Sequence, residues 1–220
     1  MSPLLQPEAD APASLSERAY YAIRELIVSL ELAPGAVVSE RELMERLGLG
    51  RTPIREALRT LAQEKLVEVY PRRGIFVSPV DVGDLAALSE ARIALETFAA
   101  RLAAERATPA DSEVALALLD ELPRAALEHD ERALIGLDQR IHRHVYRCAH
   151  NPFIESTLNE YYVLTLRIWF LALDRVARLD DAVTEHRELL EAIRDGDPSR
   201  AAAVMQRHIE GFERAIRAVL

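Results

Sequence analysis

Four side chains that could bind a metal ion fall on the apolar stripes of predicted helices. They are Asp138 and His142 in a helix expected over 130–149, His186 in a helix over 179–195, and His208 in a helix over 197–219. Three neutral imidazoles and one carboxylate are a common ligand set for zinc and other first-row ions. The spacing of Asp138 and His142, four residues apart, would place two ligands on one helical face.

Polar groups at such core positions need compensation, because a buried carboxylate without a partner would bind a proton rather than stay ionised. A divalent cation would supply this compensation, and so would hydrogen bonds within the core. Helical spacing does not show that the three helices meet, so both explanations stay open at this point. The other histidines lie off these stripes or at helix ends, and we assign them no role: they are His129, His144 and His150.

A second group of residues that could do chemistry is basic. The segment LGRTPIREALRTL, residues 49–61, places Arg51, Arg55 and Arg59 along one stripe of a helix. The whole chain has a net charge of −9, yet residues 51–73 hold six basic side chains against three acidic ones. A local basic face suits a polyanion partner, since electrostatic attraction is short-ranged in physiological salt. A solvated helix face is the alternative explanation.

The elements expected around these arginines favour the polyanion. They are helices over 16–30 and 39–48, a third helix capped by Thr52 with Pro53 at its first position, and a hairpin of 66–70 and 74–77. Three helices and a hairpin form a winged helix-turn-helix. The third helix of that fold delivers side chains to base edges in the major groove, and a basic hairpin tip can reach the sugar-phosphate backbone. We therefore expect double-stranded DNA as the partner.

The remaining sequence predicts an all-helical bundle, because glycine is rare after residue 81 and capping residues precede prolines at several places. The expected helices are 82–106, 109–128 with a candidate break at Pro123, 130–149, 151–174, 179–195 and 197–219. The fold class is thus mostly α. We expect a disordered tail over 1–13, a winged helix-turn-helix DNA-binding domain over 14–78, and an all-helical effector-binding and dimerisation domain over 79–220.

Residues 18–78 carry a family resemblance. The segment PGAVVSERELMERLGLGRTPIREALRTL, followed by VEVYPRRGIFV, is similar to the DNA-binding domain of the GntR family of bacterial transcriptional regulators. Carried over by position, the family's DNA contacts fall on Arg41, Arg51, Thr52, Arg55 and Gly74, and the basic wing adds Arg72 and Arg73. Two residues depart from the family pattern: Gly50 replaces a usual serine, and Lys65 replaces a glycine that is common before the wing.

The helical part resembles a second domain type. The segments DQRIHRHVYRCAHNP, TEHRELLEAIRDGDPSRAAAVMQRHIE and EARIALETFAARLAAERA are similar to the FCD ligand-binding domain of the FadR-like subfamily of GntR regulators. In the metal-binding branch of that subfamily, the ligands fall on the same four residues: Asp138, His142, His186 and His208. We therefore expect a divalent metal ion, zinc before nickel or manganese.

The resemblance also implies a small organic acid as the effector. Arg92 matches the arginine of the family's R-x-x-x-E segment and is our first candidate for binding the carboxylate. Arg167, which lies between aromatic and aliphatic residues in LTLRIWF, is the second candidate. For both arginines, a salt bridge within the bundle is the alternative.

Composition limits where the protein acts. No apolar run approaches the roughly 18 residues of a membrane span, and the N-terminal residues lack the basic start of a secretory signal. The only cysteine, Cys148, cannot form an internal disulfide. We therefore expect a cytoplasmic protein without a membrane partner.

These observations predict a ligand-responsive bacterial transcriptional regulator rather than an enzyme. A homodimer is expected, because paired recognition helices read two half-sites. One alternative is a helical metal-dependent hydrolase, although no motif such as H-E-x-x-H supplies a general base beside the metal. The other is a DNA-binding regulator whose C-terminal domain only dimerises and holds no metal.

Overall fold

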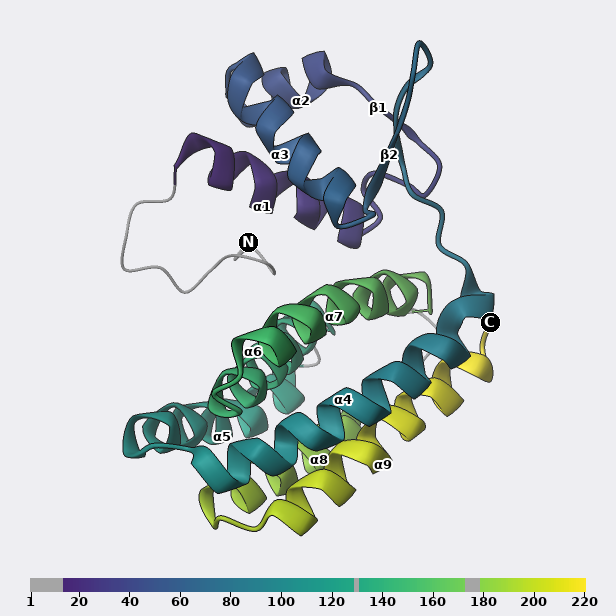
Figure 1. The fold of residues 1–220 in the computed structure, drawn as a ribbon. Helices are drawn as coiled ribbons and strands as arrows, with labels where there is room; N and C mark the ends of the chain where they lie inside the picture. Colours follow the sequence, from purple (N-terminus) through teal and green to yellow (C-terminus); the bar gives the residue numbers. More distant parts are fainter. Residues whose placement is uncertain (1–13, 129–130, 173–178) are drawn as a thin grey trace. The chain divides into compact units, whose positions relative to one another are not determined.

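The computed structural model describes residues 14–128, 131–172 and 179–220 of the chain (Figure 1). These residues form nine α-helices, one short 3-10 helix and a three-stranded sheet. None of the described helices has both the length and the apolar composition that crossing a membrane requires. Some predictions lie outside the described residues: the tail over 1–13, the helix ends at 130 and 173–174, and His129.

The winged helix-turn-helix fold is confirmed in the N-terminal part of the chain. It consists of α1 (Leu15–Val28), β1 (Val37–Val38), α2 (Glu40–Leu47), α3 (Arg51–Gln63), β2 (Val67–Tyr70) and β3 (Gly74–Val77). The strand order is β1-β3-β2, with both pairs antiparallel. Strand β1 was not predicted, because two residues are too few for an alternating pattern to be recognised.

The core of this part forms where α1 packs against α3. Ile23 and Ile27 on α1 are fully buried, as are Ile54 and Leu61 on α3. Ile23 and Ile27 are one helical turn apart, and Ile54 and Leu61 are two turns apart, so each helix turns one apolar stripe inward. Consequently the opposite face of α3, which carries the arginines, remains exposed.

The start of α3 differs from the prediction. The helix begins at Arg51, Gly50 is the N-cap, and no side chain caps the helix. The prediction that Thr52 caps this helix, with Pro53 at the first position, was therefore wrong by two residues. Pro53 is still tolerated at the third position of the helix. The N–H groups of the first helical turn have no acceptor within the helix, so the missing N–H of proline breaks no hydrogen bond.

The remaining elements are all helical, as predicted. They are the 3-10 helix η1 (Val82–Asp84), α4 (Leu85–Arg106), α5 (Pro109–Glu128), α6 (Glu131–Cys148), α7 (Pro152–Ala172), α8 (Leu179–Arg194) and α9 (Pro198–Arg217). The helix expected from residue 82 thus starts with a 3-10 turn and becomes α-helical at Leu85. Pro123 lies inside α5 without ending it, so the candidate break is absent.

Contacts divide the chain into two compact units. The first contains the winged helix-turn-helix, up to Asp81, together with residues 166–171, and the second contains the rest. In the second unit α4 runs alongside α9 (Figure 1), α9 also packs against α8, and α6 packs against both α4 and α8. The predicted metal ligands lie on α6, α8 and α9, and these three helices therefore belong to one connected core.

Cys148 belongs to this core as well. It is the last residue of α6 and is completely buried, with its sulfur 3.4 Å from Nε2 of His144. Burial raises the pKa of its thiol to about 12. Since the thiolate is the reactive form of cysteine, this thiol is chemically inert at neutral pH.

Candidate metal centre and nucleic-acid interface

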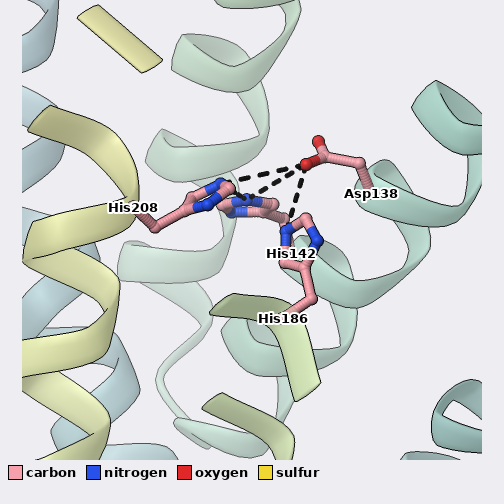
Figure 2. A group of neighbouring side chains, drawn as sticks. All are labelled: Asp138, His142, His186 and His208. Carbon is pink, nitrogen blue, oxygen red and sulfur yellow. Dashed lines mark hydrogen bonds and ion pairs between the residues drawn. The ribbon is translucent and has the colours of Figure 1, made fainter. Parts of the chain in front are cut away.

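The four predicted metal ligands lie together. Asp138 and His142 come from successive turns of α6, His186 from α8 and His208 from α9. All four side chains are buried, and one ligand atom from each lies within 4.8 Å of every other (Figure 2). The open question of whether the three helices meet is thereby answered.

The nitrogen atoms that converge are the Nε2 atoms of the histidines. Nε2 of His142 lies 3.2 Å from Nε2 of His208. Oδ1 of Asp138 lies 3.1 Å from Nε2 of His186 and 3.9 Å from Nε2 of each of the other two histidines. Three imidazole nitrogens and one carboxylate oxygen thus surround a common point.

One of these atoms lacks a partner that would account for its burial. Nε2 of His186 is buried and takes part in no hydrogen bond, although Oδ1 of Asp138 lies 3.1 Å away. An unsatisfied buried polar atom costs roughly 1–3 kcal/mol. A cation at the common point would accept the lone pair of this nitrogen. The residues therefore fit a metal ion, and their types fit zinc or another first-row ion.

Outer partners orient the ligands. Nδ1 of His142 lies 2.8 Å from Oε2 of Glu96, and Nδ1 of His208 lies 3.0 Å from Oε2 of Glu185. An ionised carboxylate can only accept, so each Nδ1 carries a proton and each Nε2 presents a lone pair to the centre. This arrangement is the usual support of metal-bound histidine.

Tyr162 of α7 supports the aspartate in a similar way, because its hydroxyl donates a hydrogen bond to Oδ2 of Asp138. Oδ1 is left facing the three histidines. Sequence reasoning missed the roles of Tyr162, Glu96 and Glu185. Two of them carried a local signal, since Glu96 is the acidic residue of the R-x-x-x-E segment and Glu185 directly precedes His186 in the sequence.

The charge states of the site suit a cation. Burial raises the pKa of Asp138, but the three neighbouring histidines outweigh it and hold this pKa well below its usual range. Burial also raises the pKa of Glu96, while Arg92 and His142 bring it down to about 2. Burial, reinforced by His186, lowers the pKa of His208 to about 4. At neutral pH the carboxylates are therefore ionised and His208 is a neutral donor.

Of the two predicted effector-binding arginines, Arg92 lies beside this centre. It is buried in α4, and its Nε lies 2.5 Å from Oε1 of Glu96, the carboxylate that also holds His142. Its guanidinium carbon lies 6.0 Å from the ring centre of Tyr162. Arg92 thus forms a salt bridge within the bundle, and through Glu96 that salt bridge connects to a metal ligand.

Arg167 is not joined to the four ligands by any hydrogen bond or ion pair of the described residues. It belongs to residues 166–171, which are part of the first unit, and its Nη2 donates a hydrogen bond to the main-chain carbonyl of Ser78. Its Nε is buried without a partner, and burial lowers the pKa of its guanidinium to about 10.

The predicted DNA-contacting residues lie on the surface of the winged helix-turn-helix. All seven are exposed: Arg41, Arg51, Thr52, Arg55, Arg72, Arg73 and Gly74. Arg51, Thr52 and Arg55 occupy the first two turns of α3, the end of a recognition helix that meets base edges in this fold. Arg41 lies on α2, where its Nε is 4.0 Å from Oε1 of Glu45.

The wing tip is a tight turn between β2 and β3. Arg72 and Gly74 both have positive φ, at 63° and 109°, which turns the chain back on itself within four residues. The guanidinium of Arg73 lies 5.9 Å from the ring centre of Tyr70. The wing therefore presents two exposed arginines at its end.

Comparison with known proteins identifies relatives of both parts. Residues 15–77 match the family described as bacterial regulatory proteins, gntR family, and residues 87–211 match the FCD domain. The chain is 35% identical over 193 residues to an uncharacterized HTH-type transcriptional regulator in an unstable DNA locus of Streptomyces ambofaciens, covering 86% of this chain and 80% of the relative. It is 30% identical over 217 residues to the galactonate operon transcriptional repressor of Escherichia coli K12, covering 86% and 92%.

A solved structure shares the fold. E. coli McbR/YncC superimposes with a TM-score of 0.77 at 24% identity, covering 92% of this chain and 99% of that one. The relatives are transcriptional regulators and not enzymes. They therefore give no support to the alternative function of a metal-dependent hydrolase, which the metal ligands alone did not exclude.

Proposed function

The chain belongs to the GntR family of bacterial regulatory proteins and carries an FCD domain, and from this premise we propose that it is a metal-dependent repressor that senses a small organic acid. The convergence of four buried donor atoms within 4.8 Å of one another is the observation that carries the sensing half of this proposal. The exposed arginines of α3 support the DNA-binding half.

In this proposal the winged helix, residues 14–78, binds double-stranded operator DNA. Arg51, Thr52 and Arg55 meet base edges and nearby phosphates, and Arg41 binds the backbone. The exposed wing residues Arg72, Arg73 and Gly74 then reach the sugar-phosphate of the adjacent groove. Base contacts set the sequence preference, while the phosphate contacts fix the position of the protein on the duplex.

The helical domain, residues 79–220, binds a divalent ion through Asp138, His142, His186 and His208. Zinc is the first choice, and nickel or manganese would accept the same donors. When bound, the ion supplies open coordination positions that a carboxylate can occupy. Glu96, Glu185 and Tyr162 keep the ligand atoms directed at the ion, and burial keeps competing water out.

Arg92 is the residue that we assign to the effector. Its Nε is held by Glu96, and no partner of its terminal nitrogens is found among the described residues. A guanidinium beside a metal centre would bind a carboxylate with two parallel hydrogen bonds. The relation to a repressor named for galactonate supports an acidic effector. Arg167 remains the second candidate.

We further propose that the chain acts as a homodimer, with the helical domain making the dimer contact. Two winged helices then read two half-sites of an operator, and the second contact multiplies a modest single-domain affinity. The effector changes the DNA affinity only to the extent that it binds one conformation of the dimer more tightly than the other.

The metal content of the purified full-length protein tests the sensing half. Elemental analysis should find about one divalent ion per chain, because the four donor atoms converge on a single point. The His186→Ala and His208→Ala variants should lose most of it, whereas His150→Ala, which changes an exposed histidine, should retain it. Full metal content in both ligand variants would contradict the site.

Small carboxylates then test the response. Sugar acids and other small organic acids should change operator affinity in the metal-loaded protein and have no effect after chelation. If metal-loaded and metal-free protein respond equally, the effector does not bind at the metal centre.

A further inference from the structure

Arg55 differs from the other arginines of the DNA-binding surface because its side chain is tethered. Its Nε donates to both carboxylate oxygens of Glu40, at 3.0 and 2.9 Å. Glu40 is the first residue of α2 and follows Ser39, which caps that helix. The Arg55 side chain is 61% exposed and that of Glu40 is 28% exposed, so the pair lies at the surface.

We propose that Glu40 is a positioning residue for DNA recognition, which fixes the guanidinium of Arg55 so that its two terminal amino groups meet a guanine. This inference rests on the proposed function of the chain as a DNA-binding regulator. It adds a specificity-determining role for a residue whose negative charge is unfavourable for contact with phosphate.

The donor inventory of Arg55 supports this role. A guanidinium has one N–H on Nε and two on each terminal nitrogen. Glu40 occupies Nε, and among the described residues no partner is found for the terminal nitrogens. Four coplanar N–H groups remain on the two terminal nitrogens, and the two that point outward in parallel match O6 and N7 of guanine in the major groove.

The other arginines of this surface lack such a tether. Arg41 approaches Glu45 only at 4.0 Å, and both side chains are mostly exposed. Arg51 has no hydrogen bond or ion pair among the described residues. The Glu40–Arg55 pair also connects the two helices of the helix-turn-helix, so it fixes the guanidinium relative to both.

The negative charge of Glu40 allows a positioning role to be distinguished from a general electrostatic effect on DNA binding. A carboxylate on a surface that faces phosphates weakens sequence-independent binding. Holding Arg55 before DNA arrives, in contrast, lowers the ordering cost of the base contact. Removal of the Glu40 charge should therefore strengthen sequence-independent binding and weaken operator binding. Specificity, which is the difference between these two affinities, should fall.

The test uses the full-length protein and an operator selected by the parent from random duplexes. The affinities for this operator and for an unrelated duplex are measured for the parent, Glu40→Ala, Glu40→Gln and the control Glu42→Gln. Glu42 lies in the same first turn of α2, and its exposed carboxylate makes no contact with Arg55. Its neutralisation removes the same charge without releasing the guanidinium.

For Glu40→Ala we expect the ratio of operator to unrelated affinity to fall about 3- to 10-fold, with unrelated binding unchanged or tighter. Glu40→Gln keeps one acceptor oxygen, so its affinity ratio should lie between those of Glu40→Ala and the parent. Glu42→Gln should tighten both kinds of binding equally. Thermal melting of each variant confirms that the fold is retained.

A chemical probe then identifies the base contact. Replacement of each operator guanine by 7-deazaguanine removes its N7 acceptor. At the guanine that Arg55 contacts, this replacement should weaken the binding of the parent. The same replacement should weaken the binding of Glu40→Ala by a smaller factor. If Glu40→Ala and Glu42→Gln change both affinities by the same factor, Glu40 acts only through its charge and the inference is overturned. If the parent itself prefers no duplex, the proposed function fails, and the inference with it.

Discussion

The side chains of the metal centre illustrate how much of a site is decided by residues that are not ligands. His142 and His208 each present Nε2 to the centre because a buried carboxylate binds Nδ1. Asp138 presents Oδ1 because Tyr162 donates to Oδ2. The direction of each ligand atom therefore depends on a partner that helical spacing could not show.

We predict that Glu185→Gln lowers metal affinity by about 10- to 100-fold while leaving all four ligands in place. The neutral amide accepts the Nδ1 proton of His208 more weakly, so the imidazole becomes a poorer and less well-oriented donor. Competition with a chromogenic chelator measures the affinity. The matched control is Glu188→Gln on the same helix, whose carboxylate binds Arg207. Equal affinities for the two variants would show that Glu185 has no part in the site.

On the DNA-binding surface, Arg55→Ala should weaken operator binding by about 1–3 kcal/mol, because a bidentate base contact is lost. Fluorescence anisotropy with the selected operator measures this change. Arg101→Ala serves as the control, since Arg101 is also exposed and also binds a glutamate through Nε, at 3.2 Å from Glu105. Unchanged operator binding by Arg55→Ala would remove α3 as the recognition helix.

At the scale of secondary structure, long periodic segments were predicted well and short or irregular ones were not. The helices from α4 to α9 and the β2–β3 hairpin follow from apolar spacing and turn residues. Strand β1 and η1 were missed, since they span only two and three residues and depend on their neighbours. Gly50 as the N-cap of α3 was also missed, because glycine gives no side-chain signal there.

The candidate site shows the same division. Periodicity placed Asp138, His142, His186 and His208 on buried faces, and that pattern is visible along a single helix. It could not show that α6, α8 and α9 turn these faces toward one point, because that depends on how the helices pack. The resemblance to a known family supplied this step, and the structure confirmed it.

The end of α3 provides a test at this scale. Lys65 has a φ of 59°, its N–H donates to the Ala62 carbonyl, and the N–H of Leu66 donates to Leu61. This is a Schellman cap, in which glycine is the favoured residue. Lys65→Gly should raise the free energy of unfolding by about 0.5–1 kcal/mol, since relief of left-handed strain of about 1–2 kcal/mol exceeds the cost of a more flexible unfolded chain.

Urea denaturation of Lys65→Gly against the parent measures this gain. Lys65→Ala removes the same side chain but keeps a Cβ in the left-handed conformation, so it should give no gain. A glycine variant no more stable than the alanine variant would mean that this turn is unstrained.

Considered as a whole, the chain is acidic in its helical domain and locally basic in one segment of the winged helix. The six basic residues of 51–73 lie in the winged helix, while residues 81–220 carry 17 basic against 25 acidic side chains. Phosphate repels the acidic part and attracts the basic part, so the charge distribution itself favours approach of DNA by the winged helix.

Metal removal should affect the stability of the molecule, because the four ligands connect three helices of one core. An ion that binds only the folded chain stabilises it by about 2.7 kcal/mol when its free concentration is 100 times the dissociation constant. Chelation should therefore lower the midpoint of thermal unfolding, as followed by circular dichroism. His208→Ala should show the same midpoint with and without the ion. If chelation leaves the unfolding midpoint of the parent unchanged, no stabilising ion is bound at these four residues.

The burial of Cys148 opens a direct way to watch the regulator work. Because this only thiol is enclosed and stays protonated at neutral pH, a maleimide dye should leave the folded parent unlabelled. A single cysteine introduced in place of exposed Arg73 would then be the one point of attachment. In the proposed homodimer, energy transfer between two such dyes would report the separation of the wing tips as acid, ion and DNA are added in turn.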